Sequence, residues 1–150
     1  MSDLRELYQS VILDHNRKPR NFREPENANR CARGDNPLCG DKLTVFLTIE
    51  ADVVTDAAFT GSGCAISTAS ASLMTEAIKG RPRDEVERLF EGFHTLVTSN
   101  PRSPAVTSQL GKLAVFSGVR EFPVRVKCAT LAWHTMNAAL SENGEIATTA

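Results

Sequence analysis

The sequence predicts an α+β fold in one domain, with a small antiparallel sheet of about three strands packed against several helices. The chain has 150 residues, which is the length of one ordinary domain, so we assign residues 1–150 to it. Segments with β-strand alternation lie in the first half, whereas longer segments with helical periodicity fill the second half. Hydrophobic residues make up 41% and charged residues 23%, which excludes a disordered, collagen-like or coiled-coil chain.

Composition also excludes several classes of partner. The net charge is −1, so the chain lacks the basic excess with which proteins bind nucleic-acid phosphates. Seven Phe, one Trp and one Tyr are too few for a base-stacking platform. No apolar run approaches the roughly 18 residues of a membrane span, and the first residues do not resemble a secretory signal. We therefore expect a cytoplasmic protein without nucleic-acid or membrane partners.

The first half of the chain predicts one helix followed by a hairpin. The helix begins at Ser2 or Asp3 and ends before the basic residues 17–20. Its inward face comprises Leu4, Leu7, Tyr8, Val11, Ile12 and His15. Residues 42–50 and 53–60 alternate as half-buried strands joined by a turn at 51–52, and residues 29–33 are a candidate third strand.

The second half predicts helices. The segment 61–63 interrupts the strand pattern, and a helix over 65–79 follows, with Gly80 as its stop. An amphipathic helix is expected over 84–93. After a loop at 99–104, we expect a helical stretch over 105–116 closed by Gly118, a linker that Pro123 ends, and a last helix over 126–140. The tail beyond 143–144 is polar and expected to fray.

Three of the four cysteines occupy settings that suit a metal ligand. Cys39 and Asp41 flank Gly40 just before a strand, and extended residues two apart project to one side, so both can point at one ion. Cys64 is expected at a helix N-terminus, where free N–H groups and the helix dipole lower the pKa of a thiol.

Cys128 is expected in the first turn of the last helix. There the helix dipole and the nearby cations Arg125 and Lys127 would also favour a thiolate. Three thiolates and one carboxylate form a donor set suited to Zn²⁺ or to iron in a sulfide cluster. The spacing contains no Cys-x-x-Cys pair, so on spacing alone, buried or isolated thiols remain an alternative.

The remaining cysteine and the histidines are expected to be structural. Cys31 lies among Asn29, Arg30 and Arg33, with no feature that lowers its pKa, and is interpreted as a strand or loop cysteine without function. His15 and His94 are expected to be satisfied core or surface histidines. His134 lies about 240° around the helix from Cys128, so it should not share an ion with that thiol.

The cysteine motifs resemble those of the IscU/NifU N-terminal family of iron–sulfur cluster assembly proteins. The three motifs are Asn36-Pro37-Leu38-Cys39-Gly40-Asp41, Gly61-Ser62-Gly63-Cys64-Ala65-Ile66-Ser67 and Arg125-Val126-Lys127-Cys128-Ala129-Thr130-Leu131. The resemblance extends to stretches within 7–21 and 69–72. Within the family the chain resembles the SufU branch, because Lys127 stands where the scaffold branch carries a histidine and residues 100–118 form an insertion.

The resemblance implies a zinc protein that accepts sulfur from a pyridoxal-phosphate-dependent cysteine desulfurase of the SufS type. If it is an enzyme, it is a zinc-dependent sulfurtransferase. The implied ligands are Cys39, Asp41, Cys64 and Cys128. Cys39 would receive the persulfide and pass sulfur to a downstream cluster scaffold or apo-protein, and Arg125 or Lys127 is a candidate to stabilise the attacking thiolate.

Two alternatives remain at this point. The same four ligands could hold iron, so that the protein is a scaffold on which a [2Fe–2S] cluster is assembled and transferred. A purely structural zinc domain is the other alternative.

Overall fold

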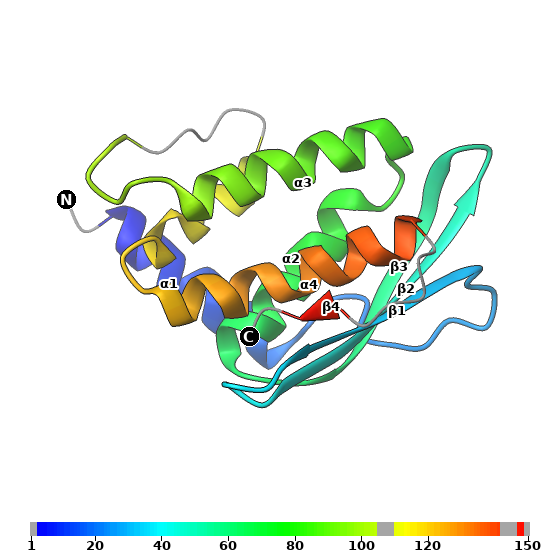
Figure 1. Cartoon of the computed structure of the whole chain (residues 1–150), viewed down its shortest axis with the longest axis horizontal. Helices are drawn as coiled ribbons and strands as arrows, with labels where there is room; N and C mark the ends of the chain where they lie inside the picture. The colour runs from blue at the N-terminus through cyan, green and yellow to red at the C-terminus, as the bar shows by residue number, and fades with distance from the viewer. Residues whose placement is uncertain (1–2, 105–109, 142–146, 149–150) are drawn as a thin grey trace.

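One face of a four-stranded sheet carries the helices of the protein (Figure 1). The computed structural model describes residues 3–104, 110–141 and 147–148. The strands are β1 (Arg30–Asn36), β2 (Asp41–Glu50), β3 (Val53–Ser62) and β4 (Ala147–Thr148), in the order β3-β2-β1-β4. The first three pair antiparallel, and β4 lies parallel to β1. This confirms the predicted α+β fold and its three antiparallel strands.

Two tight turns organise the sheet. Ala51 and Asp52 both have positive φ (50° and 62°), as a two-residue hairpin turn requires, and join β2 to β3 where the turn was predicted. Gly40, with φ of 72°, ends the turn between β1 and β2. The β1–β2 register pairs Asn36 with Asp41, so β1 extends three residues beyond the predicted segment 29–33.

The predicted strand break at 61–63 is wrong in part, because β3 continues to Ser62. Gly61 has φ of 136°, and a Cβ there would collide with the carbonyl oxygen of Lys42 on the neighbouring strand. The glycine therefore allows close pairing of β3 with β2 instead of ending the strand. The expectation of a frayed tail is also wrong at Ala147 and Thr148, which pair with Gly34 and Asp35 of β1.

The helices are α1 (Asp3–Arg17), α2 (Ala65–Ile78), α3 (Arg83–Thr98) and α4 (Pro123–Ser141), with a 3₁₀-helix, η1 (Gly111–Val119). The predicted limits of α1 and α2 are confirmed to within a few residues. α3 runs five residues beyond the predicted end at 93, because Leu96 and Val97 continue its buried face. Of the predicted helical stretch 105–116, residues 105–109 lie outside the described residues, and residues 111–116 belong to the 3₁₀-helix.

The structure corrects two expectations about residues 118–123. Gly118 does not close the helical stretch, since η1 continues through it to Val119. Pro123 begins α4 instead of ending a linker, because the first helical position needs no N–H donor. Cys128 is therefore the sixth residue of the helix and lies in its second turn, not in its first.

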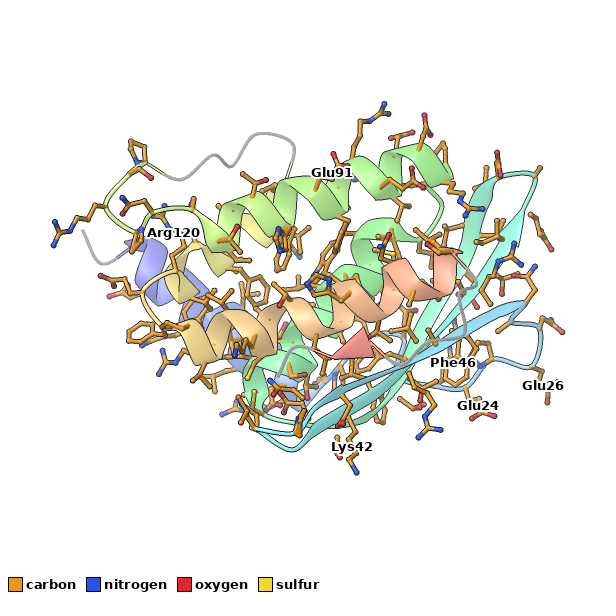
Figure 2. All side chains as sticks on the ribbon, in the orientation of Figure 1. Glu24, Glu26, Lys42, Phe46, Glu91 and Arg120 are labelled. Carbon is orange, nitrogen blue, oxygen red and sulfur yellow. The ribbon has the colours of Figure 1, made fainter. Side chains whose placement is uncertain are left out.

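The core lies between the sheet and the helices. α4 contacts β1 and β2, α2 contacts β3, and α3 forms an outer layer against α4 and η1 (Figure 1). Trp133 of α4 is fully buried and stacks on Phe93 of α3 with ring centroids 4.6 Å apart. Side chains on the other face of the sheet, such as Lys42, point away from the helices (Figure 2). No described helix combines the length and apolar character needed to cross a membrane.

α4 lies close to the sheet at Gly34 of β1. A Cβ built on Gly34 would collide with Thr135 Oγ1 and lie 3.2 Å from Leu131 Cδ1, both on α4. The missing side chain therefore lets α4 lie directly on β1. This contact fixes the distance between the end of β1 and Cys128, which lies one helical turn before Leu131.

We predict that Gly34→Ala destabilises the protein by about 1–3 kcal/mol, because the added methyl group forces α4 away from β1. Urea denaturation followed by circular dichroism measures the change in the free energy of unfolding. Gly92→Ala in α3 is the matched control, since its Cβ would meet only the flexible end of Leu110, at 3.3 Å. Alanine is favoured over glycine inside a helix, so the control should be neutral or stabilising. Equal stability of both variants would contradict the prediction.

Candidate metal centre

The four predicted ligands lie on three parts of the fold that meet at one end of the sheet. Cys39 lies in the turn between β1 and β2, and Asp41 is the first residue of β2. Cys64 precedes the first turn of α2, and Cys128 lies in α4. Residues separated by up to 89 positions in the chain therefore approach one another only because the sheet, α2 and α4 pack together.

Cys39, Asp41 and Cys128 form a compact group of donors. One ligand atom from each lies within 4.8 Å of the others. The Sγ atoms of Cys39 and Cys128 are 3.5 Å apart, and both thiols are free. Asp41 and Cys128 are buried, whereas Cys39 is half-buried. The structure thus brings Cys39 and Asp41 close together, although Cys39 lies in a turn and not in the extended segment on which the expectation was based.

Cys64 adjoins this group from the side of α2. Its Sγ is 3.9 Å from Asp41 Oδ2, but it does not lie within 4.8 Å of all the other donors. Its side chain caps α2 by accepting a hydrogen bond from the Ser67 N–H at 3.4 Å, so the predicted setting at a helix N-terminus is confirmed. Tetrahedral sulfur ligands of zinc lie about 3.8 Å apart, so Cys64 must turn towards the group to act as a fourth ligand.

Asp41 connects the sheet to α2. Its Oδ1 accepts a hydrogen bond from the Cys64 N–H at 2.9 Å, and the side chain has no exposed surface. The carboxylate lies against Gly63, where an added Cβ would be 2.7 Å from Oδ1 and 3.1 Å from Cγ. Gly63 therefore provides the space that the Asp41 side chain occupies. Sequence reasoning did not single out this glycine, although it lies inside the second cysteine motif.

The pKa of the Cys128 thiol is shifted upward, although a downward shift was expected. Burial raises the pKa of its thiol well above the usual range, and hydrogen bonding to the thiols of Cys39 and Cys64 raises it further. The helix dipole and the neighbouring cations were expected to favour a thiolate, whereas for the side chains alone the effect of burial on the pKa is larger. The second turn of α4 is too far from the helix N-terminus for the dipole to compensate for burial. A cation bound within the group would supply the missing charge.

The two cations near Cys128 lie at the edge of the site. Arg125 is exposed and stacks over the Phe122 ring, with its guanidinium carbon 4.4 Å from the ring centroid. Lys127 is half-buried. Burial raises the pKa of the nearby Tyr8 hydroxyl, and the Arg125 charge opposes this shift. Arg125 therefore acts on Tyr8 as well as on the solvent side of the site.

The residues predicted to be structural lie outside the donor group. Cys31 is exposed on β1 opposite Phe46, and partial burial together with the Glu24 carboxylate raises the pKa of its thiol. His15 is buried, and its Nδ1 lies 2.7 Å from Ser72 Oγ. His94 and His134 pack ring against ring with centroids 5.5 Å apart. Among the described residues, none of these side chains belongs to the metal-binding group.

Comparison with known proteins gives a consistent match. The family described as the NifU-like N terminal domain matches residues 7–129. The chain is 36% identical over 141 residues to the zinc-dependent sulfurtransferase SufU of Bacillus subtilis, covering 94% of each protein. It is 35% identical over 143 residues to the iron–sulfur cluster assembly scaffold protein IscU of Streptococcus pyogenes serotype M1, covering 95% of this chain and 88% of that protein.

A solved structure agrees with these matches. It is described as a candidate iron–sulfur cluster assembly scaffold protein for the SUF system of Fervidobacterium islandicum AW-1. The TM-score is 0.81 at 31% identity, and the match covers 90% of this chain and 97% of that chain.

We predict that Gly63→Ala lowers the affinity for Zn²⁺ by at least about tenfold, because the new methyl group displaces the Asp41 carboxylate. Competition against a chromophoric chelator measures the affinity. Gly118→Ala is the control, since its Cβ would make only ordinary contacts with the Tyr8 ring, the shortest at 3.5 Å. If Asp41→Ala and Gly63→Ala act through the same carboxylate, the double variant should lose little more Zn²⁺ affinity than Asp41→Ala alone. Wild-type affinity in Gly63→Ala would contradict the prediction.

Proposed function

This chain belongs to the NifU-like N-terminal domain family, and on that premise we propose that it is an iron–sulfur cluster assembly protein that accepts sulfur at a zinc-bound cysteine. The observation that carries the proposal is the convergence of Cys39, Asp41 and Cys128 within 4.8 Å, with Cys64 beside them. One carboxylate supplies too few hard oxygen donors for Mg²⁺ or Ca²⁺, whereas a set of three thiols and one carboxylate suits zinc. The match to the Bacillus subtilis relative covers 94% of each protein, and that relative is named as a zinc-dependent sulfurtransferase.

Zinc would be held by Cys39, Asp41, Cys64 and Cys128. When bound, it keeps the ligating sulfurs deprotonated in a buried site. The chain's own residues decide which sulfur reacts. Asp41 and Cys128 have 0% and 3% exposure, whereas Cys39 lies half-buried in a turn. Cys64 is half-buried too, but the Ser67 N–H holds its sulfur at the start of α2. Cys39 is therefore the acceptor that a partner can reach.

The reaction at Cys39 is a transfer of sulfane sulfur. The Cys39 thiolate attacks the terminal sulfur of a persulfide on the partner enzyme, forming a new S–S bond on Cys39. The S–S bond on the partner breaks, and the partner's cysteine leaves as a thiolate. No net oxidation or reduction occurs. Arg125 or Lys127 would stabilise the negative charge at the attacking or leaving sulfur.

The surface around Cys39 supports docking of a partner protein. Leu38, directly before Cys39, is 70% exposed, and two residues near the start of α4, the helix that carries Cys128, are also exposed: Phe122 at 43% and Val124 at 57%. Exposed apolar side chains beside a reactive residue are typical of a site that another protein covers. We propose a pyridoxal-phosphate-dependent cysteine desulfurase of the SufS type as this partner. A cluster scaffold or an apo-protein would then receive the sulfur.

A scaffold for cluster assembly is the second candidate. The same sulfur donors suit iron, and the Streptococcus pyogenes relative is named as an IscU scaffold. Lys127, in the position before the third cysteine, favours sulfur transfer because lysine is a poorer metal ligand than histidine at neutral pH. Metal analysis of protein purified without added metal distinguishes the two. About one zinc and a colourless solution support sulfur transfer, whereas bound iron and visible absorption support the scaffold.

We predict that removal of zinc lowers the midpoint of thermal unfolding by on the order of 10 °C, because the ligands join the β1–β2 turn to α2 and α4. Calorimetry before and after treatment with a chelator measures the shift, with metal content verified in each sample. Restoring the midpoint with Zn²⁺ is the control for chelator effects. An unchanged midpoint after verified removal would exclude a stabilising metal.

We predict that this protein increases the rate at which its cysteine desulfurase converts cysteine to alanine, since an acceptor removes the persulfide that blocks the next turnover. Alanine production measures the rate, and circular dichroism verifies the fold of each variant. Cys39→Ala should abolish the stimulation. Cys31→Ala should retain it, because Cys31 is exposed on β1 and lies outside the donor group.

Two results would contradict this assignment. Equal stimulation by wild type and Cys39→Ala would exclude Cys39 as the acceptor. No stimulation by folded, zinc-loaded wild type would favour the scaffold function.

A further inference from the structure

Two buried donor groups beside the cysteine cluster have no hydrogen-bond partner among the described residues. They are Nδ2 of Asn36 and the hydroxyl Oγ of Ser67. Both residues have 0% exposure, so water does not satisfy them at the surface. A buried donor without an acceptor is costly, and most such groups in folded proteins are paired. Two of them at one site call for an acceptor that the neutral thiols of the site do not provide.

The Asn36 side chain is fixed so that its free donor remains on the cluster side. Asn36 ends β1 and pairs with Asp41 across the sheet, and directly opposed residues project to the same face. Its Oδ1 accepts a hydrogen bond from the Leu38 N–H at 3.2 Å, and its backbone oxygen accepts one from the Cys39 N–H at 3.2 Å. Both oxygens of Asn36 therefore accept hydrogen bonds from the turn that contains Cys39, whereas Nδ2 donates none.

Ser67 approaches the cluster from α2. Its backbone N–H already donates to Cys64 Sγ, and residues three apart lie on the same side of a helix. Its Oγ is buried and, among the described residues, bonds to no carbonyl oxygen of the preceding turn. The hydroxyls of two other fully buried residues of α2 are paired: Ser70 donates to Ala129 O at 2.6 Å, and Thr75 donates to Ser72 O at 2.8 Å.

The metal-bound site would contain one further kind of acceptor, namely charged sulfur. A thiol sulfur is a weak acceptor, whereas a metal-bound thiolate carries negative charge and forms stronger, charge-assisted hydrogen bonds. We propose that Asn36 and Ser67 are positioning residues that donate hydrogen bonds, through Nδ2 and Oγ, to the Cys39 and Cys64 sulfurs of the metal-loaded site. This inference rests on the proposed function only in that the site binds a metal through its cysteines.

The two hydrogen bonds have separate effects. The bond from Asn36 would restrain the Cys39 sulfur, which the proposed function makes the acceptor. The bond from Ser67 would orient the Cys64 sulfur towards the other donors, which is the movement that four-coordinate binding requires. Because each bond withdraws electron density from sulfur, both lower the energy of the sulfur electrons.

Binding of Co²⁺ tests the inference, because cobalt–thiolate charge-transfer absorption reports directly on ligating sulfur. Ser67→Ala removes the hydroxyl and keeps the backbone N–H. We expect it to shift the charge-transfer band to longer wavelength and to weaken Co²⁺ binding by about tenfold. The metal-free variant should be as stable as wild type or more so, because the donor that it loses has no partner there.

Ser70→Ala is the matched control. It removes a second fully buried serine of the same helix, whose hydroxyl is paired with the Ala129 carbonyl oxygen. We expect lower stability of the metal-free protein, with the cobalt spectrum unchanged. The two serines should thus give opposite results in the two measurements.

Asn36→Asp tests the other donor. The variant keeps an oxygen acceptor for the Leu38 N–H but replaces the donor with a carboxylate oxygen that repels charged sulfur. We expect a shift of the cobalt band to longer wavelength and a loss of affinity larger than that of Ser67→Ala.

Distinct outcomes overturn the inference and the proposed function. An unchanged cobalt spectrum and affinity in Ser67→Ala and Asn36→Asp would refute the inference. Wild type that binds Co²⁺ but does not stimulate the desulfurase would refute sulfur transfer and leave the inference standing. Wild type that binds no Co²⁺ would refute both.

Discussion

The hydrogen bond from the Cys64 N–H to Asp41 Oδ1 is the interaction on which the geometry of the site depends. A fully buried carboxylate needs donors close by, and the N-terminus of α2 supplies one together with the positive end of the helix dipole. The same bond sets the position of α2 relative to β2. Gly63 makes this approach possible, since any larger residue would occupy the space of the carboxylate. One contact thus orients Asp41 and brings Cys64 to the site.

The negative charge of the ionised ligands favours the binding of a cation. Three thiolates and a carboxylate held close together repel one another, and burial raises the pKa of the Cys128 thiol. The cations that the sequence offers do not relieve this. Arg125 stacks on Phe122 at the surface, and Lys127 is only half-buried. A metal ion inside the group neutralises the charge directly, so metal binding and ligand ionisation depend on each other.

The parts of the fold that the sequence predicted depend on local signals. The turn at Ala51 and Asp52 and the limits of α2 follow from short-range patterns. The sequence did not predict the start of α4, because proline fits both a linker and a first helical turn. It also did not predict the 3₁₀ character of η1 or the pairing of β4, because tertiary contacts decide both. Likewise, spacing alone could not bring Cys39 and Cys128 together. Their approach depends on Gly34 lying against Thr135, a contact between distant segments. Motif resemblance identified the cysteines, but it gave no reason to select Asn36 or Ser67, because their unpaired donors are found only when buried donors are matched with acceptors.

The stacking of Trp133 on Phe93 gives the molecule an internal optical reporter. Trp133 is the only tryptophan in the sequence, and it lies on the same helix as Cys128, five residues further on. Its indole is fully buried between α3 and α4, so its emission depends on how these two helices pack. A movement of α4 relative to α3 would change the surroundings of this ring. The natural fluorescence of the protein therefore reports on the packing of these two helices without an attached dye.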